Sequence, residues 1–244
     1  MKISRWLLSL GLLLVIACED SKNSSSQKTN KDEQTPAQIV SENDSQEAEE
    51  SKQQSTKVAA VKLTNENVVE FLTQYGKENP ETEVTVITTF GNIDIKLYED
   101  TPLHRANFIY LVKQQYFYGT FFHRVVPNFI IQGGNSDNRT TGEKRSAIGK
   151  DYLLPAEIVP GRIHEYGTVS GAKQYRENPG KQTAPFEFFI FLGPKAATGH
   201  LNGNYTIFGR VTKGMDVVKK ISELEADSGD WPLENIYIDV QLSK

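Results

Sequence analysis

The sequence predicts a mainly β domain, closed into an antiparallel barrel and accompanied by helices, over residues 84–244 of a 244-residue chain. Short runs rich in Val, Ile, Phe and Thr recur through this region, and such residues favour strands. Gly and Pro separate the runs, and apolar residues at helical spacing occur between some of them. Closing many short strands into a barrel would remove exposed sheet edges.

The N-terminal segment, residues 1–17, is predicted to be a lipoprotein signal peptide. Lys2 and Arg5 start the segment, and its apolar run is too short for a membrane span. The run ends at Ala17, directly before Cys18, the single cysteine of the chain, and this resembles the lipidation site of bacterial lipoproteins. Lipidation of Cys18 would anchor the protein to a membrane outside the cytoplasm, in the cell envelope. An ordinary secretory signal is the alternative.

Residues 18–57 are predicted to form a disordered tether. They contain mainly Ser, Asn, Gln, Glu and Lys, without an aromatic residue. Such a segment cannot bury enough apolar surface to offset the entropy lost on ordering.

Residues 58–83 are predicted to form an amphipathic helix and its lead-in to the barrel. Thr64 is the expected N-cap, and apolar residues follow at helical spacing, namely Val68, Phe71, Leu72 and Tyr75. The apolar face is expected to pack on the barrel, and binding of a partner is the alternative.

The barrel domain is predicted to open with a hairpin and a helix. Residues 84–90 and 93–97 alternate as strands do, with Gly91 and Asn92 as the two-residue turn. Thr101 before Pro102 then predicts the start of a helix that runs to about residue 115. His104 is expected on the surface of that helix.

The stretch FFHRVVPNFIIQGG, residues 121–134, is the most informative part of the chain. It begins as a strand, is interrupted at Pro127, and resumes at Phe129. Arg124 and Gln132 lie inside this apolar stretch, where a polar group needs a partner. Composition alone describes a core strand whose arginine reaches an acid at the surface.

This stretch resembles the signature of the cyclophilin family, approximately F-H-R, two hydrophobic residues, P-x-F, a hydrophobic residue and x-Q-G-G. The resemblance covers roughly residues 84–244 and implies a closed eight-stranded antiparallel barrel capped by two helices, with the N-terminal helix as an addition. Residues 135–161 are expected to form a long loop. Residues 167–173 resemble the family's next strand, and residues 186–192 and 200–209 resemble two further motifs of the family. The second capping helix is expected in residues 215–223 and the closing strand in residues 236–242.

Cyclophilins are peptidyl-prolyl cis–trans isomerases, so the resemblance implies that proline-containing polypeptides are the partners. Rotation about an X–Pro bond breaks no covalent bond and therefore implies no cofactor and no metal. By resemblance, Arg124 donates a hydrogen bond to the prolyl nitrogen and Gln132 orients Arg124, while His123 is structural. The implied substrate-binding residues are Phe129, Ile130, Ala172, Lys173, Glu187, Phe189, His200, Leu201 and Tyr205.

Three residues depart from the family pattern. Glu187 replaces a glutamine, and its carboxylate either pairs with Arg124 and competes with substrate, or faces outward. We hypothesise that Glu187 shifts the substrate preference towards basic residues near the proline. Phe186 replaces a serine. His200 replaces a Trp or Phe, which implies weak cyclosporin binding because the indole contact is lost. A catalytically weak cyclophilin-fold module that binds proline-containing segments is therefore an alternative. A hollow barrel for a small ligand is another.

The composition argues against several classes of partner and site. The net charge is −4 without a dense Lys/Arg cluster, which argues against nucleic acid. No set of Cys and His has the spacing of a zinc site, and one cysteine cannot form an internal disulfide. We expect a monomer.

Overall fold

The computed structural model describes residues 61–173 and 178–243. The predicted signal peptide, Cys18 and the tether lie outside the described residues. Among the helices of the described ranges, none has both the length and the apolarity that a membrane span requires.

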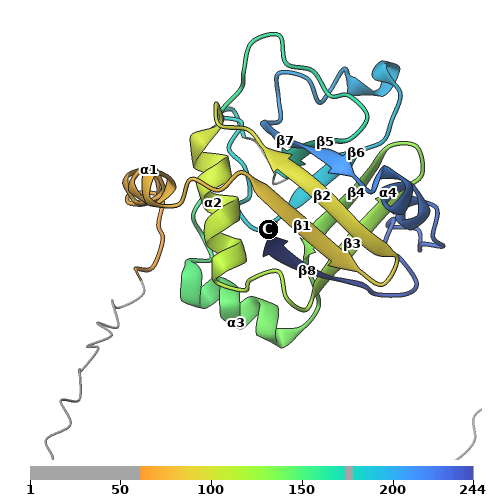
Figure 1. Cartoon of the computed structure of the whole chain (residues 1–244), viewed down its shortest axis with the longest axis horizontal. Helices are drawn as coiled ribbons and strands as arrows, with labels where there is room; N and C mark the ends of the chain where they lie inside the picture. Colours follow the sequence, from red (N-terminus) through yellow and green to blue (C-terminus); the bar gives the residue numbers. More distant parts are fainter. Residues whose placement is uncertain (1–60, 174–177, 244) are drawn as a thin grey trace, which may run out of the picture. The chain divides into compact units, whose positions relative to one another are not determined.

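The described chain forms one closed barrel of eight strands (Figure 1). Each strand is antiparallel to both neighbours, in the closed order β1-β2-β7-β5-β6-β4-β3-β8. The predicted fold class is confirmed. The strands are β1 Glu83–Thr88, β2 Gly91–Leu97, β3 Thr120–Val126, β4 Ile130–Asn135, β5 Thr168–Gly171, β6 Phe188–Phe191, β7 Ile207–Lys213 and β8 Ile236–Leu242.

Side chains fill the interior of the barrel. Phe122, Ile131, Phe188 and Ile190 come from three different strands and belong to one buried core cluster. Their neighbours Ile130 and the residues on either side of Ile190 belong to a second cluster, because successive strand residues point to opposite faces. The hollow-barrel alternative is therefore wrong, and the outer face of β4 and β6 carries apolar side chains of its own.

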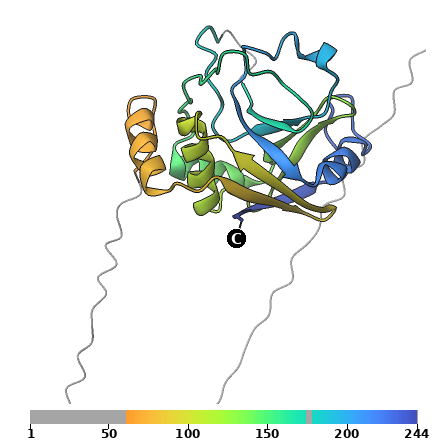
Figure 2. The ribbon, with the colours of Figure 1, turned by 45° about the horizontal axis from the view of Figure 1, so that its top comes forward.

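The helix α2, Pro102–Lys113, is enclosed on both sides (Figure 2). Every residue from His104 to Val112 is buried. Phe108 packs edge-on against Phe188 of the barrel, with ring centroids 5.5 Å apart. On the other side, Tyr110 contacts Phe71 of α1, Val68–Glu78, at 5.1 Å. The helix α2 is buried all round because the barrel covers one of its sides and α1 covers the other.

The N-terminal helix starts later than predicted. Thr64 is not its N-cap, since the helix begins at Val68 and Asn67 occupies the cap position. The Asn67 side chain instead accepts a hydrogen bond from the Thr64 N–H at 2.8 Å. The helix packs on α2, and the buried Arg105 guanidinium donates to the Gly76 carbonyl at its C-terminal end. That contact satisfies a carbonyl without an intrahelical partner.

The prediction that His104 lies on the surface is wrong. Its side chain is buried, with Nδ1 2.6 Å from the Glu157 carboxylate and Nε2 2.9 Å from the Thr183 hydroxyl. Glu157 also accepts the N–H groups of Leu103 and His104, and so caps the start of α2. Thr101, the predicted cap, makes no side-chain capping bond. A residue distant in sequence has taken its role.

The first hairpin turns two residues earlier than predicted. Thr88 pairs with Gly91, so the turn consists of Thr89 and Phe90 while Gly91 and Asn92 belong to β2. The Thr88 hydroxyl donates to the Gly91 carbonyl at 2.8 Å and accepts the Phe90 N–H at 3.0 Å. These bonds stabilise a turn without the expected Gly-Asn pair.

Residues 135–161 are not simply a loop, because they contain the helix α3, Arg139–Ile148. Only Thr141 and Ile148 of this helix are buried, so it lacks the apolar face by which helices are predicted. Polar contacts hold it instead, among them Lys144 to the Tyr118 carbonyl at 2.7 Å. Two further helices lie within the described ranges, α4, Met215–Ser222, and the short 3-10 helix η1, Lys195–Thr198.

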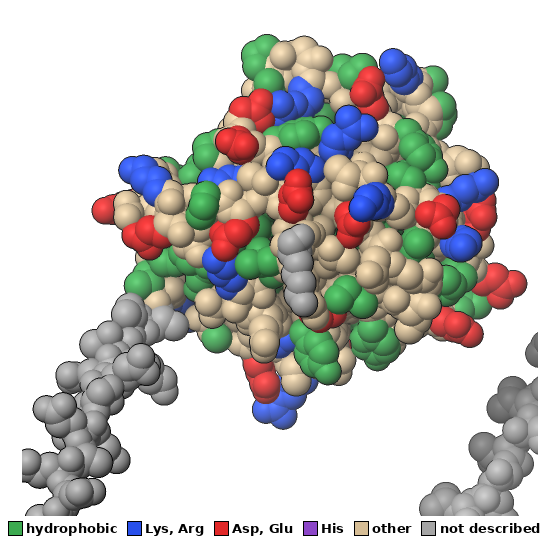
Figure 3. All heavy atoms as spheres, viewed as in Figure 1, with side chains coloured by type: hydrophobic (Ala, Val, Ile, Leu, Met, Phe, Trp, Pro, Cys, Tyr) green, Lys and Arg blue, Asp and Glu red, His purple; other side chains and the backbone are tan. Residues whose placement is uncertain are grey.

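The surface shown in Figure 3 carries acidic and basic side chains in alternation. Such a mixture is typical of a solvated face.

Candidate active site

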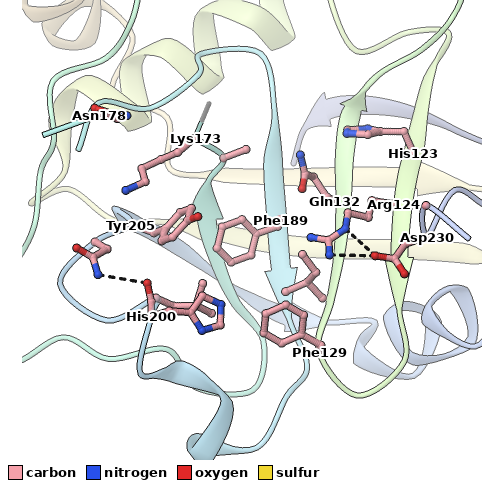
Figure 4. A pocket seen from close by; sticks show the side chains of 15 residues that line it. His123, Arg124, Phe129, Gln132, Lys173, Asn178, Phe189, His200, Tyr205 and Asp230 are labelled. Carbon is pink, nitrogen blue, oxygen red and sulfur yellow. Dashed lines mark hydrogen bonds and ion pairs between the residues drawn. The ribbon is translucent and has the colours of Figure 1, made fainter. Parts of the chain in front are cut away.

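A cleft of about 830 Å³ lies on the outer face of the barrel (Figure 4). Its apolar floor is the second buried cluster, with Ile130 from β4 and Phe189 from β6. Leu201, from the segment after η1, completes the buried part of the lining, and Phe129 and Tyr205 pack against the cluster. The cleft is therefore the face of β4 and β6 opposite to the barrel core.

The structure brings all of the predicted catalytic and substrate-binding residues except Glu187 around this cleft. The lining residues that were predicted are Arg124, Phe129, Ile130, Gln132, Ala172, Lys173, Phe189, His200, Leu201 and Tyr205. Those that sequence reasoning had not placed in the site are His123, Asn178, Asn204, Gly229 and Asp230.

The β3–β4 hairpin positions the polar pair of the site. Arg124 and Gln132 are directly opposite in the strand register, so their side chains share one face. The register shifts between Phe122 and Arg124, and such an irregularity can re-aim a side chain. The hairpin turn includes Asn128 with φ of 56°, a conformation that asparagine tolerates better than most residues.

Arg124 is held by an acid that the sequence did not reveal. Its Nε and Nη2 each lie 3.0 Å from Oδ2 of Asp230, which follows α4 in the chain. In Figure 4 the guanidinium lies between Gln132 and Asp230, with one terminal nitrogen turned away from Asp230 toward the apolar floor.

The two alternatives predicted for Glu187 are both wrong. Its carboxylate neither pairs with Arg124 nor faces outward, but lies behind the cleft with its side chain 20% exposed. It accepts a hydrogen bond from Gln132 Nε2 at 2.9 Å and lies 3.4 Å from Arg145 Nη2. His123 Nε2 lies 3.5 Å away. A preference for basic substrates based on a free Glu187 therefore loses its structural basis.

The charge of Glu187 is stabilised by these neighbours. Burial alone raises the pKa of the carboxyl, but the contacts with His123, Arg145 and Gln132 outweigh it and leave the pKa below its ordinary value. Gln132 donates one amide N–H to Glu187, and its oxygen is available to accept a hydrogen bond from a ligand. Its bond goes to Glu187 rather than to Arg124, so the expectation that Gln132 orients Arg124 is not met in this structure.

A buried histidine that was not predicted supports the floor of the cleft. His164 stacks on Phe189 with an angle of 8° between the rings, and its Nδ1 lies 2.9 Å from Asn202 Oδ1. Burial lowers the pKa of His164, which favours the neutral form of the ring. Since the Asn202 oxygen can only accept, Nδ1 carries the proton and Nε2 accepts from the Ser170 hydroxyl at 3.0 Å.

The open rim of the cleft carries a cation and an imidazole. Lys173 Nζ lies 4.7 Å from the centre of the Tyr205 ring, within the range of a cation–π contact. Burial lowers the pKa of Lys173, and the nearby charge of Lys181 lowers it further. The His200 ring lies 5.8 Å from that of Phe129.

Comparison with known proteins shows the family to which this chain is similar. Residues 83–241 match the family described as "Cyclophilin type peptidyl-prolyl cis-trans isomerase/CLD". "Peptidyl-prolyl cis-trans isomerase-like 1" of Gibberella zeae is 38% identical over 159 residues, which is 64% of this chain and 91% of the relative. "Peptidyl-prolyl cis-trans isomerase-like 2" of Rhizopus delemar is 37% identical over 166 residues, 67% of this chain but only 29% of that longer protein.

A solved structure agrees with this result. The crystal structure of the Cryptosporidium parvum cyclophilin type peptidyl-prolyl cis-trans isomerase, determined in the presence of the dipeptide Ala-Pro, superposes with a TM-score of 0.55 at 27% identity. The similarity covers 66% of this chain and 99% of that one. With its filled eight-stranded barrel and the outer cleft beside Arg124, the chain belongs to the cyclophilin family of peptidyl-prolyl cis–trans isomerases.

Proposed function

We propose that the cleft accelerates rotation about X–Pro bonds with Arg124 as the hydrogen-bond donor to the prolyl nitrogen. The barrier is about 18–20 kcal/mol, because conjugation gives the C–N bond partial double-bond character. In the twisted state this conjugation is lost and the nitrogen lone pair becomes an acceptor. A guanidinium fixed beside that nitrogen stabilises the twisted state more than either planar state, which is the requirement for catalysis.

The position of Arg124 carries this proposal. Its guanidinium lies at the edge of an apolar floor, so a proline ring seated on Phe189 and Phe129 would have its nitrogen near the charge (Figure 4). Arginine remains protonated across the physiological range, so the donor is always present. The oxygen of Gln132 would accept a backbone N–H of the substrate. The Ala-Pro dipeptide used with the Cryptosporidium relative supports proline-containing ligands for this cleft.

The cellular setting is a second part of the proposal. We propose that residues 1–17 are removed, that Cys18 is lipidated, and that residues 18–57 tether the helix of residues 58–83 and the domain of residues 84–244 to the membrane. The isomerase would then act as a monomer on proteins that fold outside the cytoplasm, in the cell envelope. Support comes from the apolar leader that ends at the single cysteine.

The catalytic proposal is tested by exchange NMR on a short X–Pro peptide, which needs no coupled protease. We expect the full-length chain to accelerate cis–trans exchange and Arg124→Ala to lose about 100-fold or more of that rate, as when a donor to a transition-state charge is removed. Peptide that binds in the cleft without faster exchange would favour the alternative of a binding module. Equal rates for wild type and Arg124→Ala would contradict the assigned donor.

The anchoring proposal is tested in bacteria that express the full-length chain with labelled fatty acid. We expect wild type to carry the label and sediment with membranes, and Cys18→Ser to do neither. Unlabelled wild type, or labelled Cys18→Ser, would refute it.

A further inference from the structure

We propose that Asp230 is the positioning residue that aims the Arg124 guanidinium into the cleft, an inference that rests on the proposed function. Two nitrogens of the guanidinium, Nε and Nη2, lie 3.0 Å from the same oxygen, Oδ2 of Asp230. An arginine side chain has many rotamers, and one hydrogen bond would leave the plane of the guanidinium free to turn. Two donors from one rigid fork fix both the plane and its direction.

This pairing leaves one terminal nitrogen for the substrate. Among the described residues, Nη1 of Arg124 has no hydrogen-bond partner, and Asp230 is the one carboxylate within 4.0 Å of the guanidinium. The nitrogen that turns away from Asp230 in Figure 4 faces the apolar floor. Asp230 thus determines which nitrogen is presented to the cleft.

The carboxylate is itself fixed to the strand that carries Arg124. The Asp230 carbonyl accepts the N–H of Val125, the residue after Arg124, at 2.8 Å. The backbone of Asp230 is therefore bound to β3 directly beside Arg124, so the positions of the carboxylate and the guanidinium are set by the same part of that strand. Any shift of the loop along the strand would have to break this backbone bond.

A compact loop holds Asp230 in that place. Oδ1 of Asp227 accepts the N–H groups of Gly229 at 2.8 Å and Trp231 at 2.9 Å, and the Asp227 N–H donates to the Trp231 carbonyl at 2.8 Å. Trp231 packs edge-on against Phe121 at 5.5 Å. Asp230 has a φ of 64°, the left-handed region that Asp and Asn tolerate better than other side chains.

Stability alone does not account for this arrangement. The two side chains are 38% and 41% exposed, and an ion pair with that much contact with water contributes little to folding. A residue in an unfavourable backbone conformation persists where its surroundings hold it there, and such residues concentrate at functional sites. The consequence of the pair is therefore the direction of the guanidinium.

The test compares Asp230→Asn with wild type in the full-length chain, alone and combined with Arg124→Ala. Asparagine tolerates the same backbone conformation and keeps the shape, but it loses the charge and one acceptor oxygen. Asp100→Asn is the matched control, because Asp100 forms an Arg–Asp pair with Arg162 and neither residue lines the cleft. Exchange NMR of an X–Pro peptide gives the rate at saturation, and a titration gives the peptide affinity.

We expect Asp230→Asn to lower the saturated exchange rate about 10-fold with little change in affinity, since misplacing a reacting group by about 1 Å can cost about 100-fold. In the Arg124→Ala background the same change should have no further effect, because Asp230 acts through Arg124. The Nε–H signal of Arg124, assigned from its loss in Arg124→Lys, should shift in Asp230→Asn. Asp100→Asn should match wild type in all three measurements.

Two results would overturn the inference while the isomerase assignment stands: an active wild type with an equally active Asp230→Asn, or the same fractional loss with and without Arg124. The second result would show that Asp230→Asn has a merely structural effect. This comparison remains valid if Asp230→Asn is less stable, because the substitution would destabilise the wild-type and the Arg124→Ala backgrounds alike. A wild type that does not accelerate exchange would refute the proposed function itself and this inference with it.

Discussion

Replacing Glu187 by glutamine tests the polar support behind the cleft. The side chain keeps its size, so no cavity forms, and the change is confined to charge and hydrogen bonding. At 20% exposure Glu187 has three partners, with Gln132 at 2.9 Å, Arg145 at 3.4 Å and His123 at 3.5 Å. Hydrogen bonds to a charged group contribute about 1.5–3 kcal/mol and neutral ones about 0.5–1.5 kcal/mol.

We therefore expect Glu187→Gln to lower the free energy of unfolding at pH 7 by about 2 kcal/mol, because its contacts with His123, Arg145 and Gln132 lose the carboxylate charge. For a domain of this size that corresponds to a decrease in Tm of about 6 °C. Urea unfolding followed by tryptophan fluorescence measures the difference. Glu143→Gln is the control, since its pair with Arg139 is exposed and its loss should leave stability unchanged.

The difference should depend on pH in a defined direction. The pKa of Glu187 in the folded protein lies below its ordinary value of 4.5, so over the acidic range the folded state binds fewer protons than the unfolded state. Its contribution is complete above about pH 4.5 and is lost as the pH falls through the lowered pKa. Equal stability of wild type and Glu187→Gln at pH 7, or a difference that is undiminished at pH 3, would refute this reasoning.

Three further predictions concern stability and ligand binding. Gly134→Ala should cost about 3 kcal/mol in urea unfolding, because φ is 97° and the new Cβ would lie 2.2 Å from the Phe186 carbonyl oxygen; Gly142→Ala, where nothing lies within 4 Å, should not destabilise. Leu72→Ala removes a buried side chain of α1 and should cost about 2–5 kcal/mol, unless hydrogen exchange shows that α1 already opens separately. His200→Trp should tighten cyclosporin binding in calorimetry by restoring a large apolar contact at the cleft rim, and unchanged affinity would contradict that account.

The sequence alone determined the elements whose burial follows a local period. Residues 236–242 alternate apolar and polar, and β8 occupies that range. The FFHRVVPNFIIQGG stretch predicted the strand–turn–strand unit that brings Arg124 and Gln132 together. The resemblance to the cyclophilin family, rather than a local period, implied the helix at α4. Because side chains alternate between the two faces of a strand, the sequence also indicates which residues of a strand share the face that lines the cleft.

Tertiary structure alone decided the polar contacts that hold the site and the helices. Asp230 is 106 residues from Arg124, Glu187 is 55 from Gln132, and Glu157 is 53 from His104. Such pairs produce no local pattern in the sequence, because each member is indistinguishable from an ordinary polar surface residue until its distant partner is known. The helix α3 was missed for the same reason, since polar contacts with distant backbone hold it rather than an apolar stripe. Local periodicity records what is buried, whereas the partner of each buried charge is fixed only when the barrel closes.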